Sequence, residues 1–307
     1  MRIGITGGNG NISRYISNRL VEAGHEVVAF NRSGVVPDGV RAVLVDRADT
    51  EAFVEAVQSQ KLDIGIDMIV FTAADAEVTV RAFRGVKQLI HCSTGATYGF
   101  PLPIPVTEEE PCTATQEYGK NKNEADAYFL RCWSNDRFPV TILKPNITYG
   151  FRWANELPGQ MPGSWLRRLV DGKPIVTVGD GDQIHHFLYA DDSASGFVGC
   201  IGNDKTIGQM FNICATRTYT WRMFYETVMD ILGLRVPIVG IPRDALLELC
   251  GHYPQLVERN FWHHMDHSNQ KLRRIVPEFH QLRSLEDGLR EVLRDFDRKA
   301  VEPNEPE

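Results

Sequence analysis

The sequence predicts a doubly wound α/β fold, in which a parallel sheet carries helices on both faces and a smaller C-terminal lobe follows. Over the first 145 residues, short β-rich runs alternate with helical patterns, as in a series of strand–helix units. The β-rich runs are almost continuously apolar, which is typical of parallel strands buried on both faces. After Gly150 the chain becomes rich in Trp, Pro and Gly, so a second unit is expected there.

The expected strands recur along the first unit. They cover residues 2–6, 26–30, 41–46, 67–72, 88–93 and 140–145. An amphipathic helix is expected to run through Ala23 and end at Gly24, and another to cover 50–60. Because ligands of such sheets bind beyond the carboxyl ends of the strands, we expect the functional site at that edge.

Two units are expected along the chain. Residues 1–150 should form the sheet domain, with the chain returning to it near 186–202 and 210–233. Residues 151–185 and 234–300 should form a smaller substrate lobe over the strand ends. The acidic, Pro-rich tail at 301–307 has the composition of a disordered segment.

Composition narrows the class of protein. The net charge of −7 argues against a broad basic face for nucleic acid. No apolar run approaches the roughly 20 residues that span a bilayer, and the N-terminus lacks the pattern of a signal peptide. The six cysteines are scattered without a CxxC pair, which favours reduced, structural thiols and a cytoplasmic location.

A glycine-rich loop, ITGGNGNIS, stands between the first expected strand and the first helix. Gly7 and Gly10 fill the first two places of a GxxGxxG pattern, and Ser13 fills the third. The glycines permit a tight turn and close approach to a pyrophosphate. Asn11 and Ile12 lie where the helix begins, and a helix N-terminus offers free N–H groups to an anion. A plain turn is the alternative, but the position after the first strand favours a dinucleotide site.

The end of the second strand indicates which dinucleotide is bound. An acid at this place takes the 2′-hydroxyl of NAD, but the residues here are Asn31 and Arg32. An arginine pairs with a 2′-phosphate, so the sequence favours NADP over NAD. The alternative is that Arg32 simply faces solvent.

A tyrosine and a lysine stand four residues apart in EYGKNK. If this segment is helical, Tyr118 and Lys122 leave the same face and can reach one ligand. They are either a proton-transfer pair or ordinary surface residues of a helix.

In this order, the motifs resemble the extended short-chain dehydrogenase/reductases, in particular the NAD-dependent epimerase/dehydratase family. The resemblance extends from residue 6 to about 197 and is carried by ITGGNGNIS, VDRAD, FTAAD, HCSTGATYG, EYGKNK, LKPNITYG and VGDGDQIHHFLYADDSASGF. It implies that 1–150 is an NAD(P)-binding Rossmann domain. The subgroup with FNR after the second strand also resembles the chloroplast stem-loop RNA-binding proteins.

The resemblance implies the catalytic residues. Tyr118 would be the acid/base, Lys122 its partner, and Thr94 the hydroxyl that holds the reacting oxygen. A free phenol has a pKa of about 10, which is too high for an efficient base near neutral pH. A nearby ammonium together with the positive nicotinamide ring favours the phenolate.

The resemblance also implies residues that bind cofactor and substrate. Asp46 would face the adenine and Lys122 would hold the nicotinamide ribose. The full cofactor set is Gly7, Gly10, Asn11, Ile12, Asn31, Arg32, Asp46, Thr72, Ala73, Ala74, Lys122 and Pro145. The full substrate set is Thr94, Gly95, Tyr118, Asn146, Trp153 and His185.

Two departures from the family pattern bear on the reaction. Sugar 4,6-dehydratases carry an Asp–Glu pair directly after the catalytic threonine, whereas Gly95 and Ala96 stand here, so dehydration is disfavoured. The arginine that grips a nucleotide diphosphate is replaced by His185. A neutral imidazole is a poor substitute for a bidentate guanidinium, which puts a nucleotide-sugar substrate in doubt.

The main hypothesis is an NAD(P)-dependent epimerase or oxidoreductase that acts on a hydroxyl of a sugar, possibly as a nucleotide sugar. One alternative is a carbonyl or keto-sugar reductase that releases oxidised cofactor. Another is a non-catalytic relative that binds RNA or senses cofactor, although nucleic acid is disfavoured by the charge. A homodimer through the Tyr118 helix is a further expectation. Metal binding by His263, His264 and His267 is not expected, because a polar surface explains them better.

Overall fold

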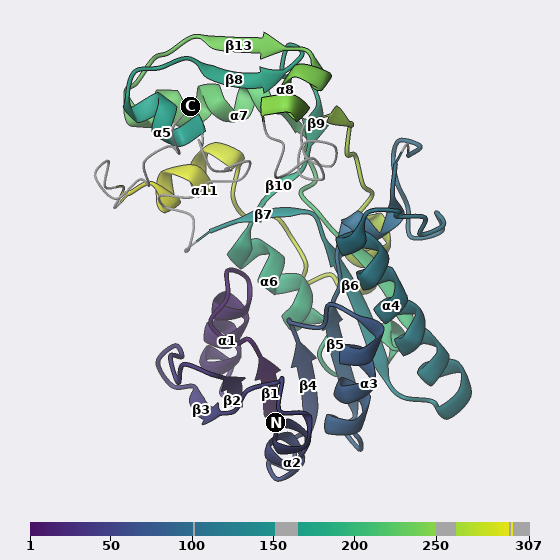
Figure 1. The fold of residues 1–307 in the computed structure, drawn as a ribbon. Coiled ribbons are helices and arrows are strands. Elements are labelled where there is room, and N and C mark those ends of the chain that lie inside the picture. The colour runs from purple at the N-terminus through teal and green to yellow at the C-terminus, as the bar shows by residue number, and fades with distance from the viewer. Residues whose placement is uncertain (101, 151–164, 250–261, 295, 297–307) are drawn as a thin grey trace.

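The computed structural model describes residues 1–100, 102–150, 165–249, 262–294 and 296. Trp153, the tail at 301–307 and parts of the expected lobe therefore lie outside the described residues. The described chain forms a seven-stranded sheet domain with a smaller lobe above it (Figure 1). Among the described residues, no helix is long and apolar enough to cross a membrane.

The central sheet is parallel throughout and confirms the predicted fold class. Its strand order is β11-β6-β5-β4-β1-β2-β3. The strands are β1 (Arg2–Thr6), β2 (Glu26–Asn31), β3 (Arg41–Leu44), β4 (Ile64–Asp67), β5 (Gln88–Cys92), β6 (Val140–Pro145) and β11 (Gln209–Ile213). The order reverses between β1 and β4, so the crevice for a ligand opens at the carboxyl ends of these two strands.

Helices cover both faces of the sheet. The pair α1 (Ser13–Glu22) and α6 (Ala190–Gly199) covers one face. The opposite face carries α2 (Thr50–Gln58), α3 (Ala73–Ala82) and α4 (Glu117–Asp136) (Figure 1).

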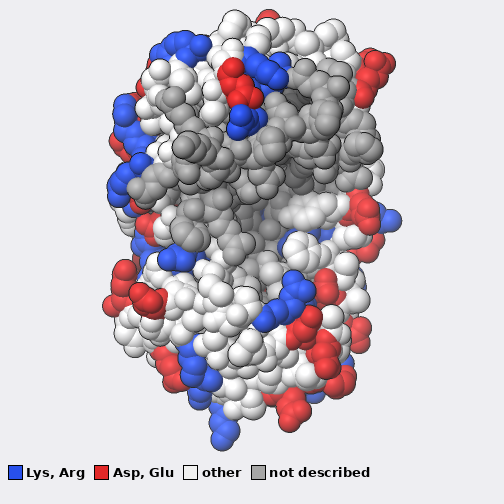
Figure 2. Space-filling view, turned by 60° about the vertical axis from the view of Figure 1, so that its left-hand side comes forward, with Lys and Arg blue, Asp and Glu red and all other residues white. Residues whose placement is uncertain are grey.

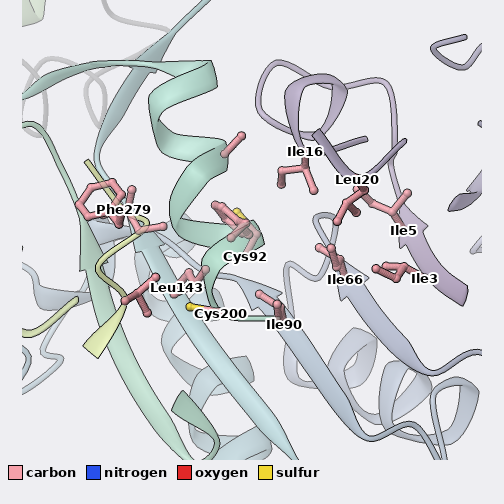
Figure 3. Packing of buried hydrophobic residues seen from close by; sticks show 14 of the residues in the cluster. Ile3, Ile5, Ile16, Leu20, Ile66, Ile90, Cys92, Leu143, Cys200 and Phe279 are labelled. Carbon is pink, nitrogen blue, oxygen red and sulfur yellow. The ribbon is translucent and has the colours of Figure 1, made fainter. Parts of the chain in front are cut away.

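The strands are almost continuously apolar because successive side chains pack into hydrophobic cores on opposite faces of the sheet. In β2, Val27 and Ala29 face the core beneath α1 and α6, whereas Val28 and Phe30 face the core beneath α2 and α3. Figure 3 shows Ile16 and Leu20 of α1 beside Ile3, Ile5 and Ile66 of the sheet.

The smaller lobe has its own aromatic core, built around Trp165, Phe187, Trp221, Phe224 and Tyr225. Of the expected return at 210–233, β11 lies in the sheet, whereas α7 packs in this second core. The lobe elements are α5 (Trp165–Val170), β8 (Ile175–Val178), β9 (Ile184–His185), β10 (Phe187–Tyr189), β12 (Tyr219–Thr220), α7 (Trp221–Leu232), β13 (Ile238–Ile241), α8 (Arg243–Leu249) and α11 (Leu285–Val292). The remaining described elements are short. They are β7 (Ile147–Tyr149), α10 (Gln270–Ile275) and the 3₁₀ turns η1 (Gly95–Tyr98) and η3 (Asp204–Thr206).

The prediction of a strand at 67–72 is wrong, because β4 ends at Asp67. The Asp67 carboxylate accepts a hydrogen bond from the Ile69 N–H at 3.1 Å. The N–H groups of Phe71 and Thr72 donate to the carboxylate of Asp75, at 3.0 and 2.9 Å. The Ile69 N–H therefore bonds to the residue that ends β4, and those of Phe71 and Thr72 bond to the first turn of α3, so none of the three joins a strand ladder although the run is apolar.

Candidate functional site

The glycine loop turns sharply at the end of β1. Gly7 has a φ of +71°, a backbone conformation that favours glycine. A Cβ on Gly8 would lie 2.8 Å from the Cβ of Ala29, so glycine is needed there for close packing. The Ser13 hydroxyl donates to the Gly7 carbonyl and accepts from the Gly10 N–H at 2.6 Å. The serine that departs from the motif therefore fastens the loop with its own side chain.

The start of α1 fits a bound anion. The helix begins at Ser13, and the preceding Ile12 supplies no side-chain cap for the first N–H groups. The amide nitrogen of Asn11 donates to the Thr148 carbonyl at 3.3 Å, whereas its buried oxygen has no partner among the described residues. Open N–H groups at a helix N-terminus suit a pyrophosphate.

At the end of β2, Asn31 and Arg32 make different contacts. The side-chain oxygen of Asn31 accepts from the Gly34 N–H at 2.7 Å, and its nitrogen donates to the Val35 carbonyl at 3.1 Å. Asn31 therefore closes its own loop. Arg32 is 80% exposed at its side chain and lies 4.0 Å from Asp46. Its guanidinium is placed at the surface, where an anionic group can reach it.

The N-terminus of α3 lies beside the lysine of the Tyr–Lys pair. Thr72 caps α3 in a reciprocal arrangement with Asp75, and Ala73 and Ala74 form the first turn. The Lys122 ammonium lies 4.7 Å from the centre of the Phe71 ring. The predicted nicotinamide-ribose segment and the predicted lysine are thus neighbours.

The three predicted catalytic residues gather at the end of β5. Tyr118 opens α4 with its side chain 38% exposed, whereas Lys122 is buried and donates to the Cys92 carbonyl at 2.9 Å. Burial lowers the pKa of Lys122, and nearby acidic groups counter this only in part. Thr94 caps η1 and accepts from the Ala96 N–H at 3.2 Å.

Glycine allows α4 to rest on the threonine loop. A Cβ on Gly119 would lie 2.5 Å from the Ala96 carbonyl oxygen, so this close approach of α4, the helix that carries Tyr118, requires glycine. A pocket of about 150 Å³ lies at the start of α4, between Ala96, Gln116 and the rings of Phe100 and His263. Those two rings stack with their centres 4.5 Å apart. The pocket therefore borders the threonine loop at Ala96 and the residue before α4, Gln116.

A buried ionic network supports this loop from below. The Asp126 carboxylate accepts from the Ser93 hydroxyl at 2.7 Å and from the His91 Nε2 at 3.2 Å, and it lies 3.2 Å from the Lys144 ammonium. Lys144 also donates to the Thr97 hydroxyl at 2.8 Å. The Thr97 hydroxyl in turn donates to the carbonyl of Thr94 at 3.0 Å. The network therefore fixes the backbone of the predicted catalytic threonine.

Sequence reasoning missed Asp126, although a signal was present. It continues the helical row of Tyr118 and Lys122 at a second interval of four residues. Lys144 of β6 also belongs to this network. The Lys144 Nζ also lies 3.0 Å from the Cys112 sulfur. No sequence pattern predicts this contact.

Pro145 and Asn146 end β6 beside this loop. Pro145 is paired in register with Ile213 of β11, and the Asn146 N–H donates to the Ile213 carbonyl at 3.0 Å. A Cβ on Gly95 would lie 2.1 Å from the Asn146 Oδ1 and 3.4 Å from the His267 Nε2. A larger side chain at position 95 would therefore displace the Asn146 amide from its present place.

The structure places His185 inside the lobe rather than on an open surface. Its side chain is 1% exposed, and its ring centre lies 5.4 Å from that of Trp221. Neither ring nitrogen has a partner among the described residues. A direct contact between His185 and substrate thus stays a prediction, whereas Thr94, Gly95, Tyr118 and Asn146 do come together. Trp153 lies outside the described residues.

The three histidines near residue 265 each contact a different part of the molecule. His263 stacks on Phe100, His264 accepts from the Ile184 N–H at 3.2 Å, and His267 lies against the Tyr98 ring. Within the described part of the chain, no group of three or more His, Cys, Asp or Glu residues could hold a metal ion.

The buried histidines predict loss of stability in mild acid. Burial, reinforced by neighbouring positive groups, lowers the pKa of His185 and of His267 to about 3. As pH falls below about 6.5, the unfolded chain takes up protons that the folded chain excludes. Each histidine should therefore reduce the free energy of unfolding by up to about 1.4 kcal/mol per pH unit between pH 6 and pH 4. Urea titrations of wild type and His185→Leu at pH 7, 6 and 5 should show the smaller slope in the variant. Equal slopes would contradict the prediction.

Comparison with known proteins identifies the family of this chain. Residues 3–214 match the model of the NAD dependent epimerase/dehydratase family. The chain is 30% identical over 267 residues to the 2′-dehydrokanamycin reductase of Streptomyces kanamyceticus, covering 85% of this chain and 75% of that protein. It is 25% identical over 238 residues to the chloroplast stem-loop binding protein of 41 kDa b of Arabidopsis thaliana, covering 72% and 60% of the two chains.

Solved structures show the same fold. A UDP-glucose 4-epimerase of Thermotoga maritima, solved with UDP-glucose, superposes with a TM-score of 0.78 at 20% identity, over 98% of this chain and all of that one. A UDP-glucuronic acid 4-epimerase of Bacillus cereus in complex with NAD gives 0.75 at 19% identity, over 97% and 100% of the two chains. The family match over most of the described sheet domain confirms the resemblance read from the motifs. The chain belongs to the NAD-dependent epimerase/dehydratase family and is an NAD(P)-dependent enzyme of the extended short-chain dehydrogenase/reductase type.

Proposed function

We propose that this enzyme reduces a ketone on a sugar ring that carries no nucleotide diphosphate. The observation that carries the proposal is His185, which stands where the resembled motif has its diphosphate-binding arginine. The residue is buried among aromatic rings and its pKa is lowered to about 3, so it brings no positive charge to that place. The Streptomyces relative, whose name describes a reductase of a dehydro-aminoglycoside, supports the same reading.

The chain's own residues account for the proton that the reduction requires. When bound, a reduced nicotinamide cofactor would supply the hydride that the carbonyl carbon accepts. Tyr118 donates a proton to the carbonyl oxygen, and Thr94 holds that oxygen by a hydrogen bond. The Lys122 ammonium stabilises the phenolate that Tyr118 becomes. Gly95 and Ala96 supply no acid or base for water loss, so the reaction ends at the alcohol.

Epimerisation is the second candidate, because the structural neighbours include nucleotide-sugar 4-epimerases. The same residues would serve it, with the ketone held between two hydride transfers. An assay of NADPH or NADH oxidation separates the two reactions. We expect stoichiometric oxidation with 2′-dehydrokanamycin and none with UDP-glucose or UDP-glucuronic acid. Interconversion of a UDP-sugar without net oxidation would overturn the proposal in favour of an epimerase.

Surface charge supports catalysis over RNA binding. Figure 2 shows one face, on which basic side chains are scattered among acidic ones rather than gathered in a patch. Non-specific binding of nucleic acid relies on clustered Lys and Arg. Tight binding of an RNA hairpin by a protein that binds neither dinucleotide would favour the RNA hypothesis instead.

We further propose NADP as the preferred cofactor, held at its 2′-phosphate by Arg32. Arg32→Ala should raise the KM for NADPH at least about tenfold, because it removes a charge-assisted pair. The KM for NADH should change little. Arg290→Ala, which removes an exposed arginine of α11, is the matched control in steady-state kinetics. An equal effect on both cofactors would contradict the assignment.

A further inference from the structure

The ring of His267 is held firmly next to the threonine loop. The residue is 2% exposed and is bridged to Val106 in parallel register. Its N–H donates to the His186 Nε2 at 2.9 Å, and its carbonyl accepts from the Cys214 thiol at 3.1 Å. The ring itself packs on Tyr98, with centres 5.5 Å apart. The backbone contacts therefore determine where the imidazole stands and leave its nitrogens uncommitted.

Two buried side chains whose polar atoms lack partners meet at Gly95. Neither ring nitrogen of His267 and neither amide atom of Asn146 has a hydrogen-bond partner among the described residues. Both side chains face Gly95, since a Cβ there would contact the Asn146 Oδ1 and the His267 Nε2. Buried polar groups are almost always hydrogen-bonded, so four such atoms together need an explanation. No described residue around these atoms supplies a hydrogen bond to them.

The position relates these atoms to the reaction. Gly95 directly follows Thr94, and Ala96 supports the helix that begins beside Tyr118. Any ring whose carbonyl meets Thr94 and Tyr118 brings its adjacent substituents close to Gly95. The two side chains together offer donors as well as acceptors, because a neutral imidazole has one of each and a primary amide has both. A hydroxyl group also donates and accepts, so it complements this pair better than an anion or an apolar group.

We propose that His267, together with Asn146, binds a hydroxyl group on the ring carbon next to the reacting carbonyl and so selects hydroxylated substrates. The inference rests on the proposed reduction of a sugar ketone. It adds a residue from the far end of the chain to the predicted site. Burial with Lys144 and His186 nearby keeps the pKa of His267 low, so the imidazole stays neutral and can both donate and accept.

The first test uses the free protein and does not depend on activity. His267→Leu should unfold at the same urea concentration as wild type or a higher one, because it removes buried polar atoms that lack partners. His280→Leu, which changes an exposed histidine, is the matched control. A midpoint clearly below both would show that the imidazole has a structural partner, and the inference would fail.

The second test compares substrates. The probes are a methyl pyranoside with its ketone at carbon 2, and its 1-deoxy and 3-deoxy analogues, which lack one neighbouring oxygen each. The 1-deoxy analogue, which lacks a methoxy group rather than a hydroxyl, is the control. Wild type should prefer the parent ketone over the 3-deoxy analogue by about 10- to 100-fold in kcat/KM. In His267→Leu this preference should fall at least about tenfold, mainly through KM, and His267→Gln should recover part of it. An unchanged preference in the leucine variant would overturn the inference.

Failure of the proposed function gives a different result. If wild type oxidises NADPH with none of these ketones, the reductase proposal falls. The hydroxyl site is then tested by binding of methyl α-D-glucopyranoside and the same two deoxy sugars to the NADP⁺ complex, followed by ligand-observed NMR. Discrimination that depends on His267 would sustain the site. Equal binding of all three sugars to wild type and His267→Leu would remove it.

Discussion

Replacing Tyr118 by phenylalanine should lower kcat for ketone reduction about 1,000-fold, which corresponds to about 4 kcal/mol of activation free energy. The change removes one oxygen atom and with it the group that donates a proton to the substrate in the proposed reaction. The side chain is 38% exposed, so the loss should not unfold the protein. Stopped-flow measurement of NADPH oxidation at saturating ketone gives the rate. NADPH fluorescence gives the affinity for the cofactor, which should be the same in the variant as in wild type.

A matched variant lies on the same helix. Tyr128→Phe makes the same chemical change in α4 more than two turns away from the threonine loop. It should leave kcat within about twofold of wild type. If Tyr118→Phe retained wild-type turnover, another group would have to move the proton, and the assignment of the Tyr–Lys pair would be wrong.

The second large effect concerns stability. Asp126→Ala should lower the free energy of unfolding by about 3 to 5 kcal/mol, because it leaves the Lys144 ammonium buried without a counter-charge. The Lys144 side chain is 0% exposed and that of Asp126 is 2% exposed, so solvent cannot replace the missing partner. Urea unfolding at pH 7, followed by circular dichroism, measures the loss.

A double variant separates the ion pair from packing. Lys144→Met alone should also destabilise, whereas Asp126→Leu combined with Lys144→Met should recover much of the loss, since well-packed apolar groups often replace a buried pair at little cost. Asp126→Leu alone completes the cycle, and losses that add in the double variant would show that the pair is not coupled. Burial alone would raise the pKa of Asp126, but hydrogen bonds from His91 and the charge of Lys144 lower it overall. This contribution to stability is therefore present above about pH 4 and is lost as pH falls further.

Much of the fold could be predicted because parallel strands buried on both faces leave a strong pattern. β6 at 140–145 and β5 at 88–92 agree with prediction to within a residue. The strand expected at 67–72 was misplaced, since an equally apolar run lies just beyond the end of β4. Beyond the end of that strand, carboxylates accept hydrogen bonds from backbone N–H groups. The hydrophobic pattern of a sequence does not indicate such hydrogen bonds.

The candidate site was predictable where motifs are local. The glycine loop, Thr94 and the pair Tyr118–Lys122 each lie within a few residues of sequence. His267 was considered only as a weak metal ligand, because its neighbour at Gly95 is more than 170 positions away in the chain. Contacts of this kind depend on how the lobe folds back over the sheet, and one sequence carries no signal for them.

The Ser13 hydroxyl gives the glycine loop its shape before any ligand arrives. A loop with glycine at that place would sample many conformations in the free enzyme and would lose that freedom when a pyrophosphate binds. Here the hydrogen bonds to Gly7 and Gly10 already hold the turn, so ordering of the loop belongs to folding rather than to binding. A dinucleotide bound at this loop would therefore meet a preorganised backbone, and the departure from the family motif would contribute to its affinity.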